Sequence, residues 1–422
     1  MRATALLVTL VPLAVLARPT LAALLVPPAP PALSPPQASA EAPRIPLDLS
    51  AAAGVYERRG AGLLVVDFKD STPLHLALGN RAAHVVVAAA LDYTEASAAL
   101  FDGVVIRRLG DGQLIVFPRL KDAQMAAEAI QNGLERWRRT THAPPLALRA
   151  AVHGGRVLID ASGERPEIYG QSVETALRLS TVGRGGDIAR ETAAGRDAVS
   201  APERREPPSP TPGLQASLAT AKMTRAAVLF AGLADFISAY ERFGRRLAYA
   251  TVKAFHEHVR LVVEELGGRV VKTEGETVMA AFDSAEAAAR AGARIQERLP
   301  SLRRAAPLGP VVSARVGLTY GRVLRQDSLE GPDYFGNRVN AAARLMRSAE
   351  PGQVLASDSL LADENADAAL MSARREKLVL KGFAEPVGVL RLRPRPAAED
   401  PALAARLTLT AERAAARVKR AP

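Results

Sequence analysis

Two aspartates stand where strands of a predicted sheet end. Asp67 lies at the end of the apolar run GLLVVDF (62–68), and Asp111 lies in the turn of the next predicted hairpin, VVIRRLGDGQLIVF (104–117). Neighbouring antiparallel strands would bring both carboxylates to one end of the sheet. Mg²⁺ typically takes one or two protein carboxylates together with substrate phosphates. Either aspartate alone is better explained as a helix cap or a turn residue, but the pair favours a metal site.

The segment after Asp67 adds a place for an anion. Residues 69–72 read KDST and precede a predicted helix. The first backbone N–H groups of a helix have no partner within it, and they suit phosphates. We therefore expect Ser71 and Thr72 to contribute to substrate binding.

A second group of polar residues follows later in the chain. Asn340 and Arg344 are four residues apart in a predicted helix, which places both on one helix face. A neutral amide and a guanidinium there could hold a sugar and a phosphoryl group. Lys272 and Asp333 provide one donor and one acceptor, enough to read the edge of a purine. Taken singly, each of these four residues could equally well be an ordinary surface charge or helix residue with no role in binding.

The chain contains one domain twice, because four blocks of sequence recur at an offset of 165 or 166 residues. The pairs are 63–72 with 227–238, 107–117 with 272–282, 148–158 with 314–324, and 166–178 with 332–344. A near-constant offset over four blocks indicates an internal repeat.

Each copy predicts the element order βαββαβ from its hydrophobic periodicity. The first copy has expected strands 62–68, 104–108, 113–117 and 146–157, with helices 84–101 and 121–137. The second has strands 226–232, 269–273, 277–282 and 311–323, with helices 239–266 and 284–299. This order predicts two ferredoxin-like α+β domains, each with helices on one face of an antiparallel sheet.

The chemical residues differ between the copies in a complementary way. The second copy has Gly232 and Glu276 at the positions of Asp67 and Asp111, so it lacks the metal pair.

Residues 333–357, DYFGNRVNAAARLMRSAEPGQVLAS, resemble the signature of class III nucleotidyl cyclases. AVLFAGLADF (227–236) and KTEGETVMAAF (272–282) resemble the family's other two landmarks. The first copy resembles the same family through VVDFKDST, RRLGDGQLIVF and IYGQSVETALRLS. The resemblance covers about residues 60–190 and 223–395.

The resemblance implies that the two domains pair head to tail as an intramolecular pseudo-heterodimer with one working site. It also implies a second, pseudo-symmetric site, which we expect to be inactive because it lacks a metal aspartate and places glutamates near the triphosphate and ribose; its residues would be Gly232, Glu276, Arg107, Glu167, Glu174 and Arg178. Asp67 and Asp111 would bind two Mg²⁺ or Mn²⁺ ions, and Lys272 with Asp333 would bind adenine. The chain is then predicted to convert ATP to cyclic AMP and pyrophosphate.

The resemblance also assigns the reacting end of the substrate. Asn340 would hold the ribose, Arg344 would stabilise the transition state, and Lys381 in VLKGF matches a phosphate-contacting lysine. The alternatives are a catalytically inactive cyclase-like protein that binds nucleotide or regulates a partner, or a guanylate cyclase.

Composition limits the other classes of function. The chain has no cysteine, which excludes disulfides, thiolate metal sites and cysteine nucleophiles. The net charge of +11 suggests anionic partners, yet only 4% of the residues are aromatic and the basic residues are scattered. We therefore expect a nucleotide, and no nucleic acid, as the anionic partner.

The predicted domain organisation begins with an apolar N-terminal segment. Residues 3–26 are long and apolar enough to anchor the chain in a membrane, with a cleaved signal peptide as the rival interpretation. ATP is cytoplasmic, so an anchor with cytoplasmic catalytic domains is the more coherent choice. A secreted binding protein would follow from a cleaved signal. The expected bounds are 1–26 anchor or signal, 27–54 Pro-rich linker, 55–192 first domain, 193–222 linker, 223–395 second domain and 396–422 basic tail.

Overall fold

The structure, a computed structural model, describes most of both predicted copies and part of the tail. The described residues are 54–69, 71–141, 146–162, 166–181, 188–190, 222–234, 236–328, 331–362, 373–380, 383 and 385–418. The predicted anchor or signal at 3–26 lies outside them, as do residues 191–221 between the copies.

The first unit, residues 55–190, is built on a six-stranded sheet. Its elements are β1 (Val55–Lys69), α2 (Ser71–Ala99), β2 (Val104–Arg108), β3 (Gly112–Phe117), α3 (Leu120–Thr141), β4 (Ala147–Asp160), β5 (Glu167–Tyr169), α4 (Gln171–Ser180) and β6 (Ile188–Arg190). The strand order is β2-β3-β1-β4-β5, and β6 pairs with β4.

The second unit, residues 222–392, is built on an eight-stranded sheet. Its elements through the hairpin are β7 (Lys222–Leu233), α6 (Ile237–Phe243), α7 (Arg245–Glu265), β8 (Arg269–Glu274), β9 (Thr277–Phe282), α8 (Ala285–Glu297), α9 (Leu299–Ala305), the 3₁₀ turn Gly309–Val311, β10 (Ala314–Ser328) and β11 (Gly331–Phe335). The rest are α10 (Asn337–Ser348), β12 (Val354–Ser357), the 3₁₀ turn Asp358–Ala362, β13 (Arg374–Leu378), β14 (Val387–Leu392) and, beyond the unit, α12 (Pro401–Arg417). The strand order is β13-β14-β12-β10-β7-β9-β8, and β11 pairs with β10.

Both units are α+β, as predicted, and their central strands follow one order. β2-β3-β1-β4 in the first sheet corresponds to β8-β9-β7-β10 in the second. The expectation of a purely antiparallel sheet was wrong, because β6 and β12 run parallel to β4 and β10. Each parallel strand follows a helix, α4 or α10, and a crossover of that length returns the chain in the parallel direction.

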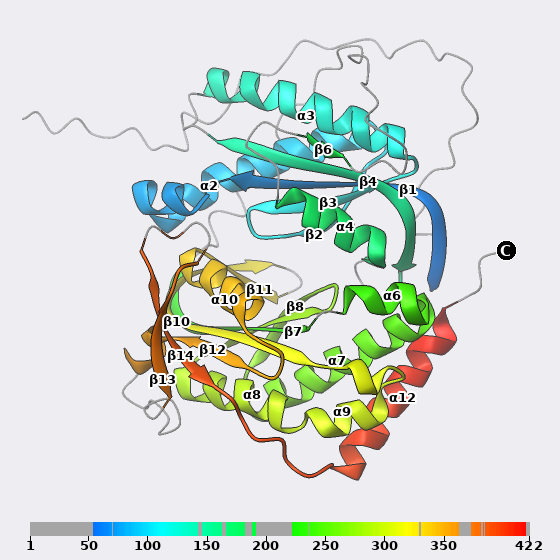
Figure 1. Cartoon of the computed structure of the whole chain (residues 1–422). Coiled ribbons are helices and arrows are strands. Elements are labelled where there is room, and N and C mark those ends of the chain that lie inside the picture. The colour runs from blue at the N-terminus through cyan, green and yellow to red at the C-terminus, as the bar shows by residue number, and fades with distance from the viewer. Residues whose placement is uncertain are drawn as a thin grey trace, which may run out of the picture.

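Helices cover both faces of each sheet, which also corrects the expectation of a single covered face. In the first unit, Leu64, Val66 and Phe68 of β1 join the core beneath α2 and α3, whereas Leu63 and Val65 join the core beneath α4. Successive strand residues point to opposite faces, so an uninterrupted apolar run buries both. In Figure 1, α4 and α10 lie between the two sheets, while α3 lies at the outer edge of the first unit and α8 and α9 at that of the second.

One glycine divides a helix that the periodicity predicted as continuous, and another interrupts α2 before the predicted helix begins. The expected helix 239–266 is α6 and α7, separated by Gly244 with φ 82° and ψ 156°. Helix α2 begins well before the predicted position 84 and contains the non-helical Gly79, with φ 76° and ψ 158°. A positive φ costs glycine little, so each break falls where the chain has one.

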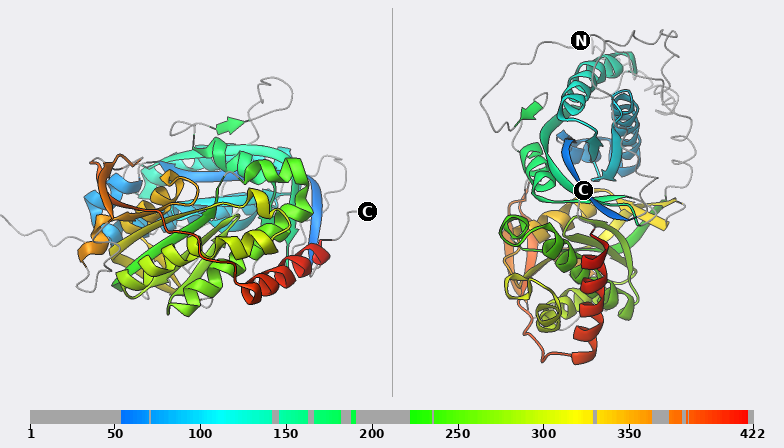
Figure 2. Two further views of the ribbon diagram at one scale, coloured as in Figure 1. Left: turned by 60° about the horizontal axis from the view of Figure 1, so that its bottom comes forward. Right: turned by 90° about the vertical axis from the view of Figure 1, so that its right-hand side faces the viewer.

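The first unit contributes to the core of the second. Val55, Leu158 and Tyr169 belong to the same buried cluster as Tyr249, Phe255 and many other residues of the second unit. Figure 2 shows the two units stacked on each other over a broad contact. The units therefore share apolar surface that neither buries alone.

The C-terminal segment forms a packed helix. Helix α12 buries Ala404, Leu407, Ala411 and Ala414, and it contacts α7 and α9. Asp400 caps its first turn by accepting from the N–H groups of Ala402 and Leu403, at 3.0 and 3.1 Å. Val418 then pairs with Val55 at the start of β1, so the helix reaches the first unit (Figure 1). Among the described helices, none has the length and apolar character needed to cross a bilayer.

The packing of α12 predicts a stability difference between two leucines. Leu407 is fully buried and Leu409 is 46% exposed. Leu407→Ala should lower the free energy of unfolding by about 2–5 kcal/mol, because the site loses buried apolar area and gains a cavity. Leu409→Ala is the matched control and should stay within about 0.5 kcal/mol of the parent. Denaturant unfolding of the full chain measures both, and equal effects would show that α12 is not part of the folded core.

Candidate active site

The two predicted metal aspartates lie side by side. Asp67 is paired with Gly112 in the β1–β3 register, and the N–H of Phe68 donates to the backbone oxygen of Asp111 at 3.0 Å. Gly112 allows this close approach, because a Cβ there would lie 2.4 Å from the backbone oxygen of Val66. The hairpin turn is thus held against the end of β1, as the strand prediction required.

Asp67 carries an unusual charge balance. Burial and repulsion from Asp111 raise the pKa of Asp67 to about 6, while the nearby guanidinium groups of Arg149 and Arg347 oppose the rise. Arg149 lies opposite Asp67 in the β1–β4 register and forms an ion pair with it. The Arg149 side chain is 12% exposed, so this cation is held close to the predicted metal site.

The donor set fits a hard divalent cation. Two carboxylates that repel each other in a partly buried corner would be stabilised by a shared cation, and Mg²⁺ prefers oxygen ligands. No third His, Asp or Glu joins them to form a metal cluster within the described residues. The pair therefore matches the few protein ligands that Mg²⁺ uses when a substrate phosphate completes its coordination.

The predicted purine-reading pair is also assembled. Nζ of Lys272 lies 3.1 Å from Oδ2 of Asp333 and 3.8 Å from Oε1 of Glu274. The other Asp333 oxygen accepts from the N–H of Tyr334 at 2.8 Å. Lys272 also lies 5.9 Å from the centre of the Phe335 ring. A donor and an acceptor are thus fixed beside an aromatic face.

Helix α10 carries two more of the predicted residues. It begins after Gly336, whose φ is 114°, and it places the half-buried Asn340 and Arg344 one turn apart. Burial lowers the pKa of Arg344, against the attraction of Asp111 and Asp67 on the first unit. Arg344 therefore interacts electrostatically with both predicted metal ligands across the interface.

Arg344 has unused hydrogen-bonding capacity. Its buried Nη1 has no hydrogen-bond partner among the described residues. Its guanidinium carbon lies 5.4 Å from the centre of the Phe383 ring, which holds one face of the group. An unpaired donor of this kind in a charged corner indicates room for an anionic ligand.

Three predicted site residues are not described by their side chains. Lys381 lies outside the described residues, although Leu380 and Phe383 on either side of it are within them. Helix α2 begins at Ser71, so a helix follows the KDST segment directly, but the side chains of Ser71 and Thr72 are not described.

The structure adds three residues that the sequence did not single out. Arg149 and Arg347 place positive charge near Asp67, and Phe383 supports Arg344. Arg149 aligns with Arg315 of the second copy, so the repeat contained a signal for it. Arg347 and Phe383 had no comparable signal, because their relevance follows from packing.

Residues 218–389 match the profile of the adenylate and guanylate cyclase catalytic domain. The match covers 172 of the 422 residues, so the second unit is similar to this catalytic domain. The matched stretch carries Lys272, Asp333, Asn340 and Arg344, so the residues of the candidate site that come from the second unit all lie within the cyclase domain.

Relatives of known sequence agree with this assignment. An uncharacterized protein of Mycobacterium tuberculosis is 37% identical over 171 residues, which are 40% of this chain and 42% of the relative. The adenylate cyclase of Glutamicibacter nicotianae is 30% identical over 160 residues, 38% of this chain and 37% of the relative. The chain spans about two fifths of the length of these curated relatives.

One solved structure resembles both units. It is a class III adenylyl cyclase-like ATP-binding protein from Pseudomonas aeruginosa, 12% identical, with a TM-score of 0.57 over 76% of this chain and 87% of its own. At this identity the likeness is one of fold, and it extends beyond the cyclase domain into the first unit.

The pseudo-symmetric region between the cyclase domain and the first unit is filled by its own side chains. Glu167 of β5 accepts from Nζ of Lys253 at 3.1 Å and from the hydroxyls of Tyr169 and Thr273. Burial would raise the pKa of Glu167, but the Lys253 ammonium and these contacts hold it below its usual value. Asp160 accepts from the Tyr249 hydroxyl at 2.6 Å and pairs with the same lysine at 3.1 Å.

A pair of carboxyls lies beside this network. Burial, and then the charge of Glu276, raise the pKa of Glu174 well above its usual range, although Arg107 and Arg347 act against the rise. The two glutamates come from different units, and their proximity favours the neutral form of Glu174. This region holds no counterpart of the aspartate pair, in line with the expectation of inactivity.

The carboxyl pair predicts a pH-dependent stability. A group whose pKa is higher in the folded than in the unfolded chain stabilises the fold at low pH, and that contribution is lost as the pH rises. Glu174→Gln should therefore raise the melting temperature at pH 8 and change it less at pH 5. Glu276→Gln should act in the same direction, because either change leaves a single carboxyl. A lower melting temperature at pH 8 in both variants would contradict the pairing.

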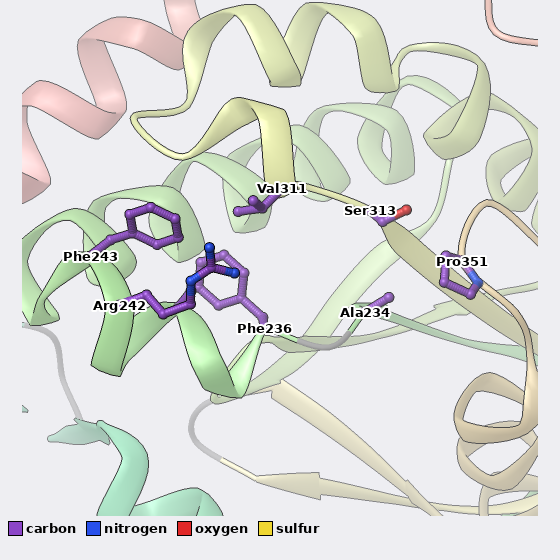
Figure 3. Close-up of a pocket in the computed structure, with 8 residues that line it drawn as sticks. Ala234, Phe236, Arg242, Phe243, Val311, Ser313 and Pro351 are labelled. Atoms are coloured by element: carbon purple, nitrogen blue, oxygen red, sulfur yellow. The ribbon is translucent and has the colours of Figure 1, made fainter.

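A small cavity lies apart from the candidate site. It has a volume of about 230 Å³ and lies between the end of β7, α6 and the start of β10 (Figure 3). Phe236, Phe243 and Val311 give it an apolar wall, with Arg242 and Ser313 as polar members. None of the candidate site residues lines it, so we do not assign it to the chemistry of the cyclase domain.

Proposed function

We propose that the chain is an adenylate cyclase that converts ATP to cyclic AMP and pyrophosphate at one composite site between its two units. The observation that carries the proposal is the electrostatic attraction between the half-buried Arg344 of the second unit and Asp67 and Asp111 of the first. In this proposal the units are two ferredoxin-like domains paired head to tail as a pseudo-heterodimer. The fold likeness to a cyclase-like protein over 76% of the chain, which includes part of both units, supports that arrangement.

Different residues of the site bind different parts of the substrate. Lys272 and Asp333 bind the adenine edge, with the Asp333 carboxylate accepting from the 6-amino group. Asn340 orients the ribose, so that its 3′-oxygen faces the α-phosphorus. Arg149, Arg347 and the N-terminal end of α2 lie near Asp67 and suit the triphosphate.

The reaction exchanges one phosphorus–oxygen bond for another. The 3′-oxygen loses its proton to solvent and bonds to the α-phosphorus, while the bond from that phosphorus to the bridging oxygen breaks and releases pyrophosphate. Arg344 donates to the phosphoryl oxygens as their charge increases. A divalent cation held by Asp67 and Asp111 would lower the pKa of the 3′-hydroxyl and balance phosphate charge.

A second candidate function is nucleotide binding without catalysis. Arg149 already forms an ion pair with Asp67, one of the predicted metal ligands. The Pseudomonas aeruginosa protein of similar fold is described as ATP-binding and cyclase-like. Stoichiometric binding of ATP with Mn²⁺ and no cyclic product would favour this candidate. The retention of both aspartates with Arg344 favours catalysis.

Removing either side of the composite site should abolish the reaction. Asp67→Ala and Arg344→Ala should each reduce cyclic AMP formation about 10²–10³-fold or more, because each removes charge stabilisation from the transition state. Arg290→Ala is the control, since Arg290 is an exposed residue of α8 with 53% of its side chain accessible. Product formation from ATP and Mn²⁺, with circular dichroism to verify folding, gives the result. Near-parental activity in either site variant would refute the proposed site.

The preference for adenine should depend on Asp333. Asp333→Ala should reduce the ratio of kcat/KM for ATP over GTP by about 10–100-fold, because a charged acceptor for the 6-amino group is lost. The measurement is steady-state kinetics with both nucleotides. An unchanged ratio would place base recognition elsewhere, and a parental preference for GTP would identify a guanylate cyclase.

A further inference from the structure

Helix α2 of the first unit reaches the base-reading pair of the second. His84 lies on α2 after the break at Gly79 and is 7% exposed. Its Nε2 donates to Oε1 of Gln326 on β10 at 3.1 Å. Its ring lies 4.4 Å from the ring of Phe335 on β11, centre to centre and tilted by 43°. One histidine thus makes a polar and an aromatic contact across the interface.

Both partners of His84 are neighbours of Asp333. Gln326 is directly opposite Asp333 in the β10–β11 register, and cross-strand partners share a face of the sheet. Phe335 is two residues beyond Asp333, and alternate residues of a strand also share a face. Lys272 completes the group through its contacts with Asp333 and with the Phe335 ring. We call Lys272, Asp333, Gln326 and Phe335 the base cluster.

The contacts of His84 restrict how the base cluster can move. A hydrogen bond to Oε1 fixes the orientation of the Gln326 amide, which otherwise can rotate by half a turn with little change in shape. That orientation directs the amide N–H groups away from His84. The ring contact fixes Phe335, and Phe335 is the face on which the Lys272 ammonium rests. A substitution of His84 should therefore alter the positions of Lys272 and Asp333, the two charged residues of the base cluster.

Resting on the proposed function, we propose that His84 is a positioning residue for nucleobase recognition, acting from the first unit on the base cluster of the second. It does not touch the base. It holds Gln326 and Phe335 so that Lys272 and Asp333 present one donor and one acceptor at a fixed spacing. Discrimination between adenine and guanine then depends on contact between the units.

The path of α2 explains why this position is suited to the role. The helix begins at Ser71, four residues after Asp67, and continues past Gly79 to His84 and the second unit. It contacts both β10 and α10. Helix α2 therefore lies next to the predicted metal site at its start and next to the base cluster further along. The same helix thus connects the two parts of the site.

The test measures nucleotide selectivity in the full chain. The variants are His84→Ala, His84→Gln, which keeps a donor near the Nε2 position, and Gln326→Ala. His258→Ala is the matched control: His258 is also buried and donates from Nε2, to the backbone oxygen of Ile295 at 3.0 Å, but it lies in the core of the second unit. Fluorescent ATP and GTP analogues with Mn²⁺ give dissociation constants, and steady-state assays give KM and kcat.

We expect His84→Ala to weaken ATP binding about tenfold, the size of one net hydrogen bond plus one ring contact. GTP binding should change less, so the selectivity ratio falls, and KM for ATP should rise while kcat changes less than about threefold. His84→Gln should recover part of the ratio. The effects of His84→Ala and Gln326→Ala should be non-additive in the double variant, because both act through one contact.

Several results would overturn the proposal, and they are separable from failure of the proposed function. If the parent chain forms cyclic AMP and His84→Ala leaves the ATP-to-GTP ratio unchanged, the positioning role is wrong and the cyclase proposal stands. A drop in melting temperature with both nucleotides weakened equally, as in His258→Ala, also overturns it. If the parent binds ATP without making product, the ratio of the dissociation constants for ATP and GTP still tests the positioning role of His84. A parent that binds neither nucleotide overturns both proposals.

Discussion

The whole site depends on electrostatic attraction between the units, from the two carboxylates of the first to the guanidinium of Arg344 on the second. Neither the charged form of Asp67 nor that of Arg344 is favoured by its own unit. Asp67 is pushed toward its protonated form by burial and by Asp111, and burial disfavours the charge on Arg344. A triphosphate with a divalent cation would satisfy both, since it carries the complementary charges. The β1 end, the β2–β3 hairpin and the start of α10 after Gly336 can all be understood as the frame that maintains this arrangement.

The interface has two ends with opposite physical character. At the Arg344 end, buried nitrogens of Arg149 and Arg344 have no hydrogen-bond partner among the described residues, and one guanidinium nitrogen of Arg107 at the other end is likewise unpaired. At that other end, Glu167 accepts from a lysine and two hydroxyls, and the neighbouring Glu276 contributes to the raised pKa of Glu174. Buried polar groups stay unpaired at a cost unless a ligand pairs with them. The first end combines two such nitrogens with the aspartate pair and is suited to an anionic ligand with a cation, whereas Glu167 and Asp160 at the second end are paired with Lys253.

This division also explains how the units stay together. The second end contributes the contacts of Lys253 with Asp160 and Glu167, and Tyr249 donates to Asp160 at 2.6 Å. The shared core containing Val55, Leu158 and Tyr169 lies on the same side. Because these contacts stabilise one end of the interface, the polar groups at the Arg344 end can remain without hydrogen-bond partners. The His84 contact with Gln326 and Phe335 adds a smaller link beside the base cluster.

Sequence by itself determined the α+β class, the repeat, most strands and helices, and the residues brought together at the site. Apolar runs and the constant offset are local properties, and a strand end followed by a hairpin turn already implies that Asp67 and Asp111 are neighbours. The i, i+4 spacing likewise implied a shared helix face for Asn340 and Arg344.

Only the tertiary structure decided which groups from different units meet. The ion pair of Arg149 with Asp67, the support of Arg344 by Phe383 and the contact of His84 with β10 depend on how sheets and helices stack. The parallel strands, the second covered face of each sheet and the docking of α12 were also decided there. Long-range packing selects among many placements that the same local periodicity allows, so these features could not be predicted from the pattern of residues alone.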